Sequence, residues 1–209
     1  MAYFSTSSAI IKDIKDIYNT GSAYMAFFFF DFKDTGKQDA RALLSSLIVQ
    51  LGRRSRSFYT ILFKFYSMHE EGSQQPSTDA LTKCLEDLIG ASGDISIYLV
   101  IDAVDECPNT KGIPSSRRQV LDLVETLVEQ DYPRLHLCIT SRPEVDIRTS
   151  LEPLTSAFNR ICLHDKIGQK NDIVEFVRGV VYSDENMGRW RDEDKQLVIK
   201  MLSEGANGM

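Results

Sequence analysis

The stretch that decides the fold is Ile97-Tyr98-Leu99-Val100-Ile101-Asp102-Ala103-Val104-Asp105-Glu106-Cys107-Pro108. A short apolar run that is rich in β-branched residues and stops at a turn signal is typical of a buried strand. Strands with continuous apolar runs are buried on both faces, as in parallel sheets covered by helices. Ligands of such sheets bind beyond the carboxyl ends of the strands. The sequence therefore predicts a functional edge at Asp102, Asp105 and Glu106.

These three acids suggest metal and phosphate chemistry. We expect Asp102 to hold Mg²⁺, directly or through water, and Asp105 or Glu106 to orient and deprotonate an attacking water. Mg²⁺ prefers oxygen ligands and is usually bound by a few carboxylates plus phosphates. The pattern has the form of a Walker B motif. The alternative is an acidic loop that caps the next helix. We also expect Asp102, at a strand end near water, to contribute little to stability.

The composition is that of a globular protein with room for one α/β domain and part of another. The chain has 209 residues, of which 43% are hydrophobic and 26% are charged. A net charge of −6 argues against a general nucleic-acid binder, which needs a basic face. The longest apolar run, Ala23 to Phe30, is far shorter than the ~20 residues of a membrane helix. The residues after Met1 lack the layout of a signal peptide.

The four cysteines are widely spaced, and the sequence has no CxxC pair, so neither a zinc site nor a disulfide framework is predicted. Cys138 and Cys162 lie in apolar, strand-like runs and are expected to be small buried side chains. Free cysteines favour a reducing, cytoplasmic location.

Strand-like and helix-like segments alternate along the chain. Strands are predicted at 23–32, 97–102, 135–140 and 160–163. Apolar residues at helical spacing predict helices at 7–18, 38–52, 58–68, 81–90, 120–128, 173–181 and 197–202. This order is typical of an α/β fold with a mostly parallel sheet, helices on both faces and right-handed crossovers.

A second polar feature follows a strand at Thr140-Ser141-Arg142-Pro143. In a parallel sheet this strand end lies at the same edge as Asp102. An arginine at this edge can hold a γ-phosphate and sense its loss after hydrolysis. The alternative is an arginine in a surface ion pair, which contributes little.

With these residues in place, the chain resembles the nephrocystin-like N-terminal nucleotide-binding module of fungal NACHT-type signal-transduction (STAND) ATPases. Such modules occur in heterokaryon-incompatibility and ankyrin- or WD-repeat proteins. The residues that carry the resemblance are Ser8 to Ile11 with Asp13-Ile14, Phe28 to Phe32, Leu44 to Leu51 with Gln50-Leu51, Tyr98 to Cys107, Leu137 to Glu144, and Gly205 to Met209.

The resemblance implies a P-loop-type nucleotide switch, in which ADP holds a closed form and exchange for ATP permits assembly. Asp102 then matches the Walker B metal aspartate, Asp105 and Glu106 match the acidic pair after it, and Arg142 matches the sensor arginine. The implied cofactors are Mg²⁺ and ATP or GTP. The implied domains are a NACHT-type core at 1–182 and the start of a helical region at 183–209.

The chain departs from this family above all in its phosphate loop, because the string GxxxxGK(S/T) occurs nowhere in it. Without the P-loop lysine and its backbone cradle, we expect weak nucleotide binding, and whether hydrolysis survives is open. The expectation is of a fragment that lacks the first strand and the P-loop. The family sheet places that strand between 135–140 and 160–163, so its absence predicts an exposed, adhesive edge.

Two other functions stay open at this point. The chain could be a non-enzymatic interaction module that pairs with full-length NACHT relatives or with itself. It could also be a metal-dependent hydrolase that uses Asp102, Asp105 and Glu106 alone. No nucleic acid or membrane is expected among the partners.

Overall fold

A computed structural model describes residues 11–12, 14–15, 18, 20–109, 114–156, 159–161, 167–184 and 186–205. The chain divides into two compact units, residues 1–154 and residues 155–209. None of the described helices combines the length and the hydropathy that crossing a bilayer requires.

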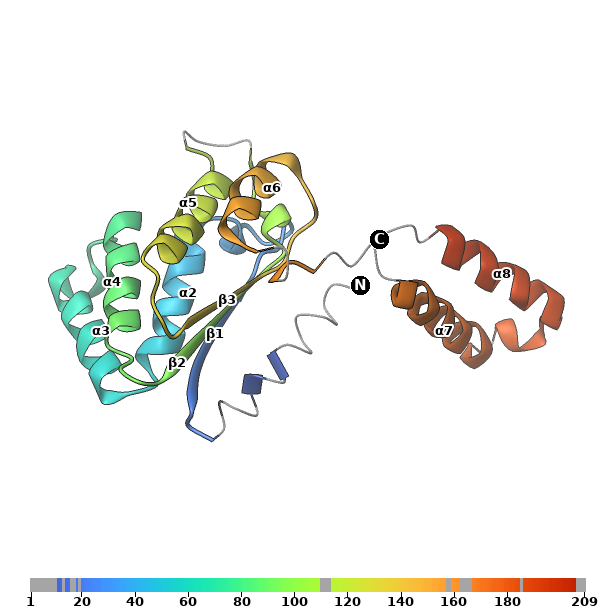
Figure 1. The fold of residues 1–209 in the computed structure, drawn as a ribbon, viewed down its shortest axis with the longest axis horizontal. Helices are drawn as coiled ribbons and strands as arrows, with labels where there is room; N and C mark the ends of the chain where they lie inside the picture. Colours follow the sequence, from blue (N-terminus) through green and yellow to red (C-terminus); the bar gives the residue numbers. More distant parts are fainter. Residues whose placement is uncertain are drawn as a thin grey trace. The chain divides into compact units, whose positions relative to one another are not determined.

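The first unit contains a three-stranded parallel sheet of order β1-β2-β3 (Figure 1). Its strands are β1 (Ala23–Phe29), β2 (Ser96–Asp102) and β3 (Leu135–Ile139). The register pairs Phe29 with Asp102, and Ile101 with Ile139. The three carboxyl ends therefore meet at one edge of the sheet, as the sequence predicts for an α/β fold.

Helices α2 (Ala40–Gly52), α3 (Arg56–Met68) and α4 (Thr78–Gly90) connect β1 to β2, and α5 (Ser116–Glu129) connects β2 to β3. Helix α6 (Val145–Leu151) follows β3. Four of these helices begin at a side-chain cap that accepts a hydrogen bond from the first turn, which satisfies an otherwise unpaired N–H. The caps are Asp39, Ser55, Ser77 and Ser115.

The hydrophobic core lies on both faces of the sheet. Helices α2, α4 and α5 lie on one side of the sheet (Figure 1), and their apolar residues, such as Leu47, Leu85 and Leu121, pack with β2. On the other face, the helical residues Ile11 and Ile14 belong to a smaller cluster with β1 and β2. The predicted arrangement of helices on both faces is therefore present in the described residues.

Strand β1 is shorter than the predicted segment 23–32. The N–H of Phe30 still donates to the carbonyl of Asp102 at 3.1 Å, but the N–H of Asp31 turns away to the carbonyl of Lys37 at 3.3 Å. A one-turn helix, Thr35–Lys37, follows. Phe28 and Phe30 are buried and pack edge to face, whereas Phe32 is exposed.

The second unit contains α7 (Ile167–Ser183) and α8 (Asp192–Gly205), which pack against each other, with a one-turn helix, Met187–Arg189, between them. The strand predicted at 160–163 is wrong at Arg160 and Ile161, which are not in a strand. Cys162 and Leu163 lie outside the described residues. The predicted domain boundary, between a core at 1–182 and a helical region at 183–209, stays a prediction.

Candidate functional site

The site is built on a turn that directly follows β2. Ala103 adopts a left-handed conformation with φ 57° and ψ 49°, and the single helical turn Val104–Glu106 follows it. A left-handed alanine is unfavourable by about 1–2 kcal/mol, so its surroundings must hold it. The N–H of Ala103 donates to Oγ1 of Thr140 at 3.0 Å, and the N–H of Val104 donates to the Thr140 carbonyl at 3.1 Å. The turn after β2 is thus fastened to the end of β3.

Asp102 is buried, with 4% of its surface exposed. Its carboxylate accepts a hydrogen bond from the hydroxyl of Thr140. The expectation that this carboxylate lies near water is therefore wrong, because the strand end is covered by the turn and by the next strand. The hydroxyl of Thr140 donates to Asp102 and accepts from the N–H of Ala103. Asp102 therefore helps to hold the turn through this shared hydroxyl.

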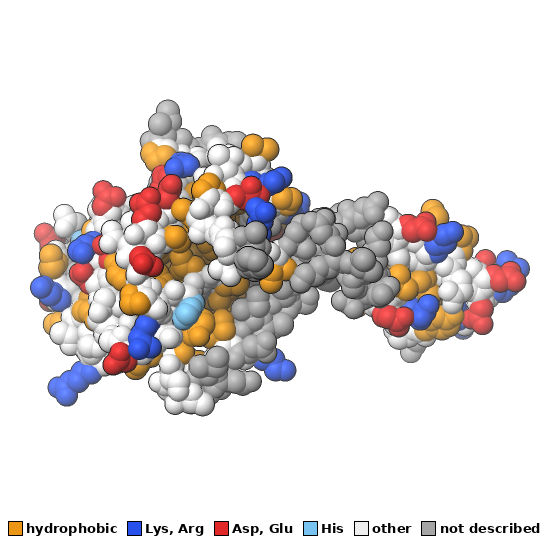
Figure 2. Space-filling view, in the orientation of Figure 1, with side chains coloured by type: hydrophobic (Ala, Val, Ile, Leu, Met, Phe, Trp, Pro, Cys, Tyr) orange, Lys and Arg blue, Asp and Glu red, His pale blue; other side chains and the backbone are white. Residues whose placement is uncertain are grey.

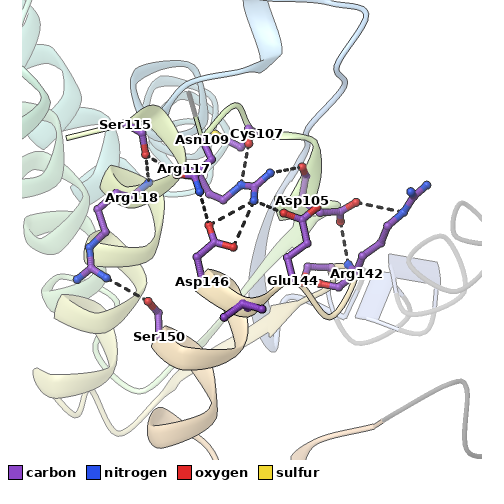
Figure 3. A network of polar contacts seen from close by, with 12 residues as sticks. Asp105, Cys107, Asn109, Ser115, Arg117, Arg118, Arg142, Glu144, Asp146 and Ser150 are labelled. Carbon is purple, nitrogen blue, oxygen red and sulfur yellow. Dashed lines mark hydrogen bonds and ion pairs between the residues drawn. The ribbon is translucent and has the colours of Figure 1, made fainter. Parts of the chain in front are cut away.

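Asp105 and Arg142 meet across the ends of β2 and β3 (Figure 3). The carboxylate of Asp105 accepts the backbone N–H of Arg142 at 2.9 Å and pairs with its Nε at 3.4 Å. The Asp105 side chain is 9% exposed, whereas the Arg142 side chain is 67% exposed. The structure thus brings together the two strand ends that the sequence placed at one edge, with the acid inside and the arginine outside.

Glu106 is turned toward another part of the edge. Its Oε2 accepts the N–H of Phe32, beyond the end of β1, at 3.1 Å. Asp102, Asp105 and Glu106 therefore have separate partners: a hydroxyl, an arginine and a backbone amide. In the part of the chain that the structure describes, no three histidine, cysteine, aspartate or glutamate side chains gather as a metal-binding group.

Arg117 is the residue of this edge that sequence reasoning missed. It lies in the first turn of α5 and is buried, yet it binds four groups (Figure 3). Its Nε donates to the Cys107 carbonyl at 2.8 Å, and a terminal nitrogen donates to the Asp105 carbonyl at 2.6 Å. The other terminal nitrogen pairs with the carboxylates of Glu144 and Asp146 at the start of α6.

The charge of Arg117 is retained despite its burial. Desolvation lowers the pKa of Arg117, but the hydrogen bond to Glu144 and the charges of Glu144 and Asp146 together raise it. Asn109 extends the network by donating to Asp146 at 2.8 Å and accepting from Ser115 at 2.9 Å. No local pattern marks such a residue, because the groups that hold it are 10 to 29 positions away.

Cys107 closes the turn as a structural thiol. It is fully buried, and its Sγ donates to the carbonyl of Gln38 at 3.3 Å. Burial raises the pKa of Cys107 to about 12, against the opposing effect of the Arg117 charge. A buried thiol with a raised pKa stays protonated at neutral pH, which fits a structural role for Cys107.

A parallel sheet with an acidic turn after one strand and an arginine after the next places these side chains at the carboxyl edge of an α/β fold. The chain belongs to the family described as nephrocystin 3, N-terminal, whose model matches residues 5–142. The matched region includes all three acids and ends at Arg142. No curated protein matches the chain, and no solved structure does so either.

The residues of this edge do not by themselves fit a magnesium nucleotide. Asp102 is covered and engaged by Thr140, and Asp105 is engaged by Arg142. The backbone cradle and lysine that bind phosphates have no matching string in the 209 residues. A phosphate at this edge would therefore meet one exposed arginine beside an acid that already pairs with it.

Proposed function

We propose that this chain carries the acid-and-arginine edge of a NACHT-type nucleotide switch and that by itself it binds nucleotides weakly. One observation carries the proposal: Asp105 and Arg142 pair across the ends of two neighbouring parallel strands. The resemblance to NACHT-type ATPases matches Asp105 to the acidic pair after the Walker B aspartate and Arg142 to the sensor arginine. The family match supports the module, and the NACHT, STAND and fungal assignments belong to this proposal.

The chain's own residues keep this edge in one arrangement. Asp105 fixes the backbone of Arg142, while Thr140 fixes the turn that carries Asp105. Arg117 holds the carbonyl of Asp105 from behind and ties it to the start of α6. A change at Arg142 would thus reach α6 through residues in direct contact, which is the kind of connection that a switch requires.

Isothermal titration with Mg-ATP and with Mg-GTP tests the proposal. We expect dissociation constants of roughly 1 mM or weaker, which is the weak end of the affinity scale. Arg142→Met should remove the residual saturable binding, whereas Arg118→Met, an exposed arginine on α5, should leave it unchanged. A dissociation constant in the low micromolar range would contradict the proposal that this chain binds nucleotides weakly. Equal effects of Arg142→Met and Arg118→Met on binding would contradict the placement of the nucleotide site at this edge.

A second function is favoured by the open edge of β3. In the described residues, β3 pairs with β2 alone. An unpaired strand recruits other chains through its backbone, whatever the state of the nucleotide edge. This supports an interaction module, which needs neither nucleotide nor metal. Association of the pure protein in the absence of nucleotide distinguishes this function from the first.

A further inference from the structure

The outer edge of β1 is capped at Phe27 by a side chain. The N–H of Phe30 points to β2, and because peptide groups alternate along a strand, those of Phe27 point away from it. Gln50 of α2 satisfies both: its Oε1 accepts the Phe27 N–H at 3.1 Å, and its Nε2 donates to the Phe27 carbonyl at 2.7 Å. The same Nε2 also contacts the hydroxyl of Ser46 at 3.0 Å. A single amide thus imitates a neighbouring strand.

The outer edge of β3 has no such cover in the described part of the chain. The Arg134 carbonyl accepts from Ile97 at 2.8 Å and the Thr140 N–H donates to Ile101 at 3.0 Å, so these peptides face β2. By alternation, the peptides of Leu135, Leu137 and Ile139 face outward. No described residue donates to or accepts from the outward peptides of Leu137 and Ile139.

Strand β3 itself is mostly apolar and contains no lysine, arginine, aspartate or glutamate. The strand reads Leu-His-Leu-Cys-Ile, and its leucines and isoleucine are only half-buried. A hollow of about 270 Å³, lined in part by Tyr98, Val100, His136 and Leu137, adjoins it. The space-filling view shows hydrophobic side chains gathered on the surface of the first unit (Figure 2). The charges that natural edge strands use against pairing are missing from β3.

The sequence of β3 is complementary to itself when two copies run antiparallel about Leu137. Leu137 then faces Leu137 of the second copy, and Leu135 faces Ile139. The outward peptides of Leu137 meet each other, and the carbonyl of Leu135 meets the N–H of Ile139. The N–H of Leu135 already donates to the carbonyl of Tyr132 at 3.1 Å. His136 faces Cys138 on the neighbouring pairs. No like charges oppose each other, despite the net charge of −6 on each chain. A two-fold interface requires this kind of self-matching.

We propose that β3 pairs with β3 of a second copy of this chain and joins the two sheets into one. The proposal deepens the interaction-module function and rests on it alone, so the outcome of the nucleotide titration does not affect it. Strand pairing by five residues gives a small interface, and small interfaces are weak and transient. The dimer should therefore form in a concentration-dependent manner.

Light scattering coupled to size exclusion tests this proposal on the full chain without nucleotide. At roughly 100 μM, well above micromolar dissociation constants, we expect a mass approaching twice the chain mass of 23.7 kDa. His136→Lys places a charge on the edge and should weaken the dimer at least about tenfold, a difference of ~1.4 kcal/mol. The same change at an exposed site, Gln75→Lys, should have no effect. A monomer at every concentration would overturn the proposal.

Cysteine cross-linking checks the register without depending on the stability of the lysine variant. In the proposed pairing, residue 136 lies opposite Cys138 of the second copy, with Cα atoms ~4.5 Å apart, which suits a disulfide. Mild oxidation of His136→Cys should give a covalent dimer on a non-reducing gel, and the double variant with Cys138→Ser should not. A dimer that resists His136→Lys and does not cross-link through position 136 would place the interface elsewhere.

Discussion

The hydroxyl of Thr140 holds the two most constrained groups of the site, the buried carboxylate of Asp102 and the N–H of the left-handed Ala103. A hydroxyl shared in this way cannot be replaced by a methyl group without leaving both partners unpaired. Thr140 and Asp102 therefore stabilise the fold of this edge, whichever ligand the edge binds.

We expect Thr140→Val to lower the free energy of unfolding by about 1–3 kcal/mol, the usual effect of leaving buried polar groups unsatisfied. Asp102→Ala should cost a similar amount, whereas Asp102→Asn should cost less because the amide oxygen still accepts. Urea unfolding of these variants and of the Thr140→Val/Asp102→Ala double variant measures the coupling. Strictly additive effects would show that the two side chains act independently.

Arg117 and Arg118 are adjacent on α5 and form a matched pair for a second test. Arg117 is buried among two carbonyls and two carboxylates, while Arg118 is half exposed and pairs with Asp122 at 2.6 Å. Arg117→Met should destabilise the protein by about 2–3 kcal/mol, since it leaves acceptors of charge-assisted bonds unpaired. Arg118→Met should cost at most ~1 kcal/mol. Equal losses in urea unfolding would contradict a special role for Arg117.

The sequence predicts part of this site because strand ends are local features. Asp102, Asp105 and Arg142 follow apolar runs, and a parallel sheet brings such ends together, as observed for Asp105 and Arg142. The orientation of Glu106 toward Phe32 and the burial of Arg117 depend on contacts between distant segments. Neither leaves a periodic signal, so neither was predictable from the sequence.

At the scale of elements, the long amphipathic helices and the three apolar strands are predictable because burial imposes a period on the sequence. Helix α6 is not, since it has seven residues and only Ile147 among them is buried. The apolar residues that follow Arg160 in the predicted strand 160–163 suggested a strand, although Ile161 is 66% exposed. A run of this length has no period to test, and tertiary context decides its structure.

Gln50 allows a prediction at the same scale, because it joins α2 to the edge of β1. Gln50→Ala removes both hydrogen bonds to Phe27, and we expect a loss of about 1–3 kcal/mol in the free energy of unfolding. Gln75→Ala, at an exposed glutamine, is the control and should change stability by less than ~0.5 kcal/mol. Hydrogen exchange at the Phe27 amide should also accelerate in Gln50→Ala; unchanged protection would mean that the amide is shielded in another way.

For the whole molecule, the composition and the order of elements predict the α/β class, and the sheet confirms it. The division after residue 154 was not predictable, because no linker composition marks it. The larger hydrophobic cluster and all three strands lie within residues 1–154. The two units are thus stabilised differently. The first has a sheet with apolar packing on both faces, and the second has two helices that pack against each other.

This division predicts that residues 1–154 fold without the rest of the chain. We expect cooperative thermal unfolding of the shortened protein, with a midpoint within about 4 °C of the full chain, which corresponds to at most about 1–2 kcal/mol for a domain of this size. Circular dichroism of both proteins is the measurement. A non-cooperative transition in the shortened protein would show that residues 155–209 complete its core.

The amide of Gln50 has a consequence for how large an assembly of this chain can become. In the language of polymer chemistry, a sheet with two reactive ends is a divalent monomer and grows into fibres, whereas a sheet with one reactive end is monovalent. If β3 pairs as proposed and Gln50 caps β1 at Phe27, the molecule is monovalent, and we expect strand pairing to stop at two copies. Gln50 is then the chain terminator, and its removal changes the valence of the molecule from one to two.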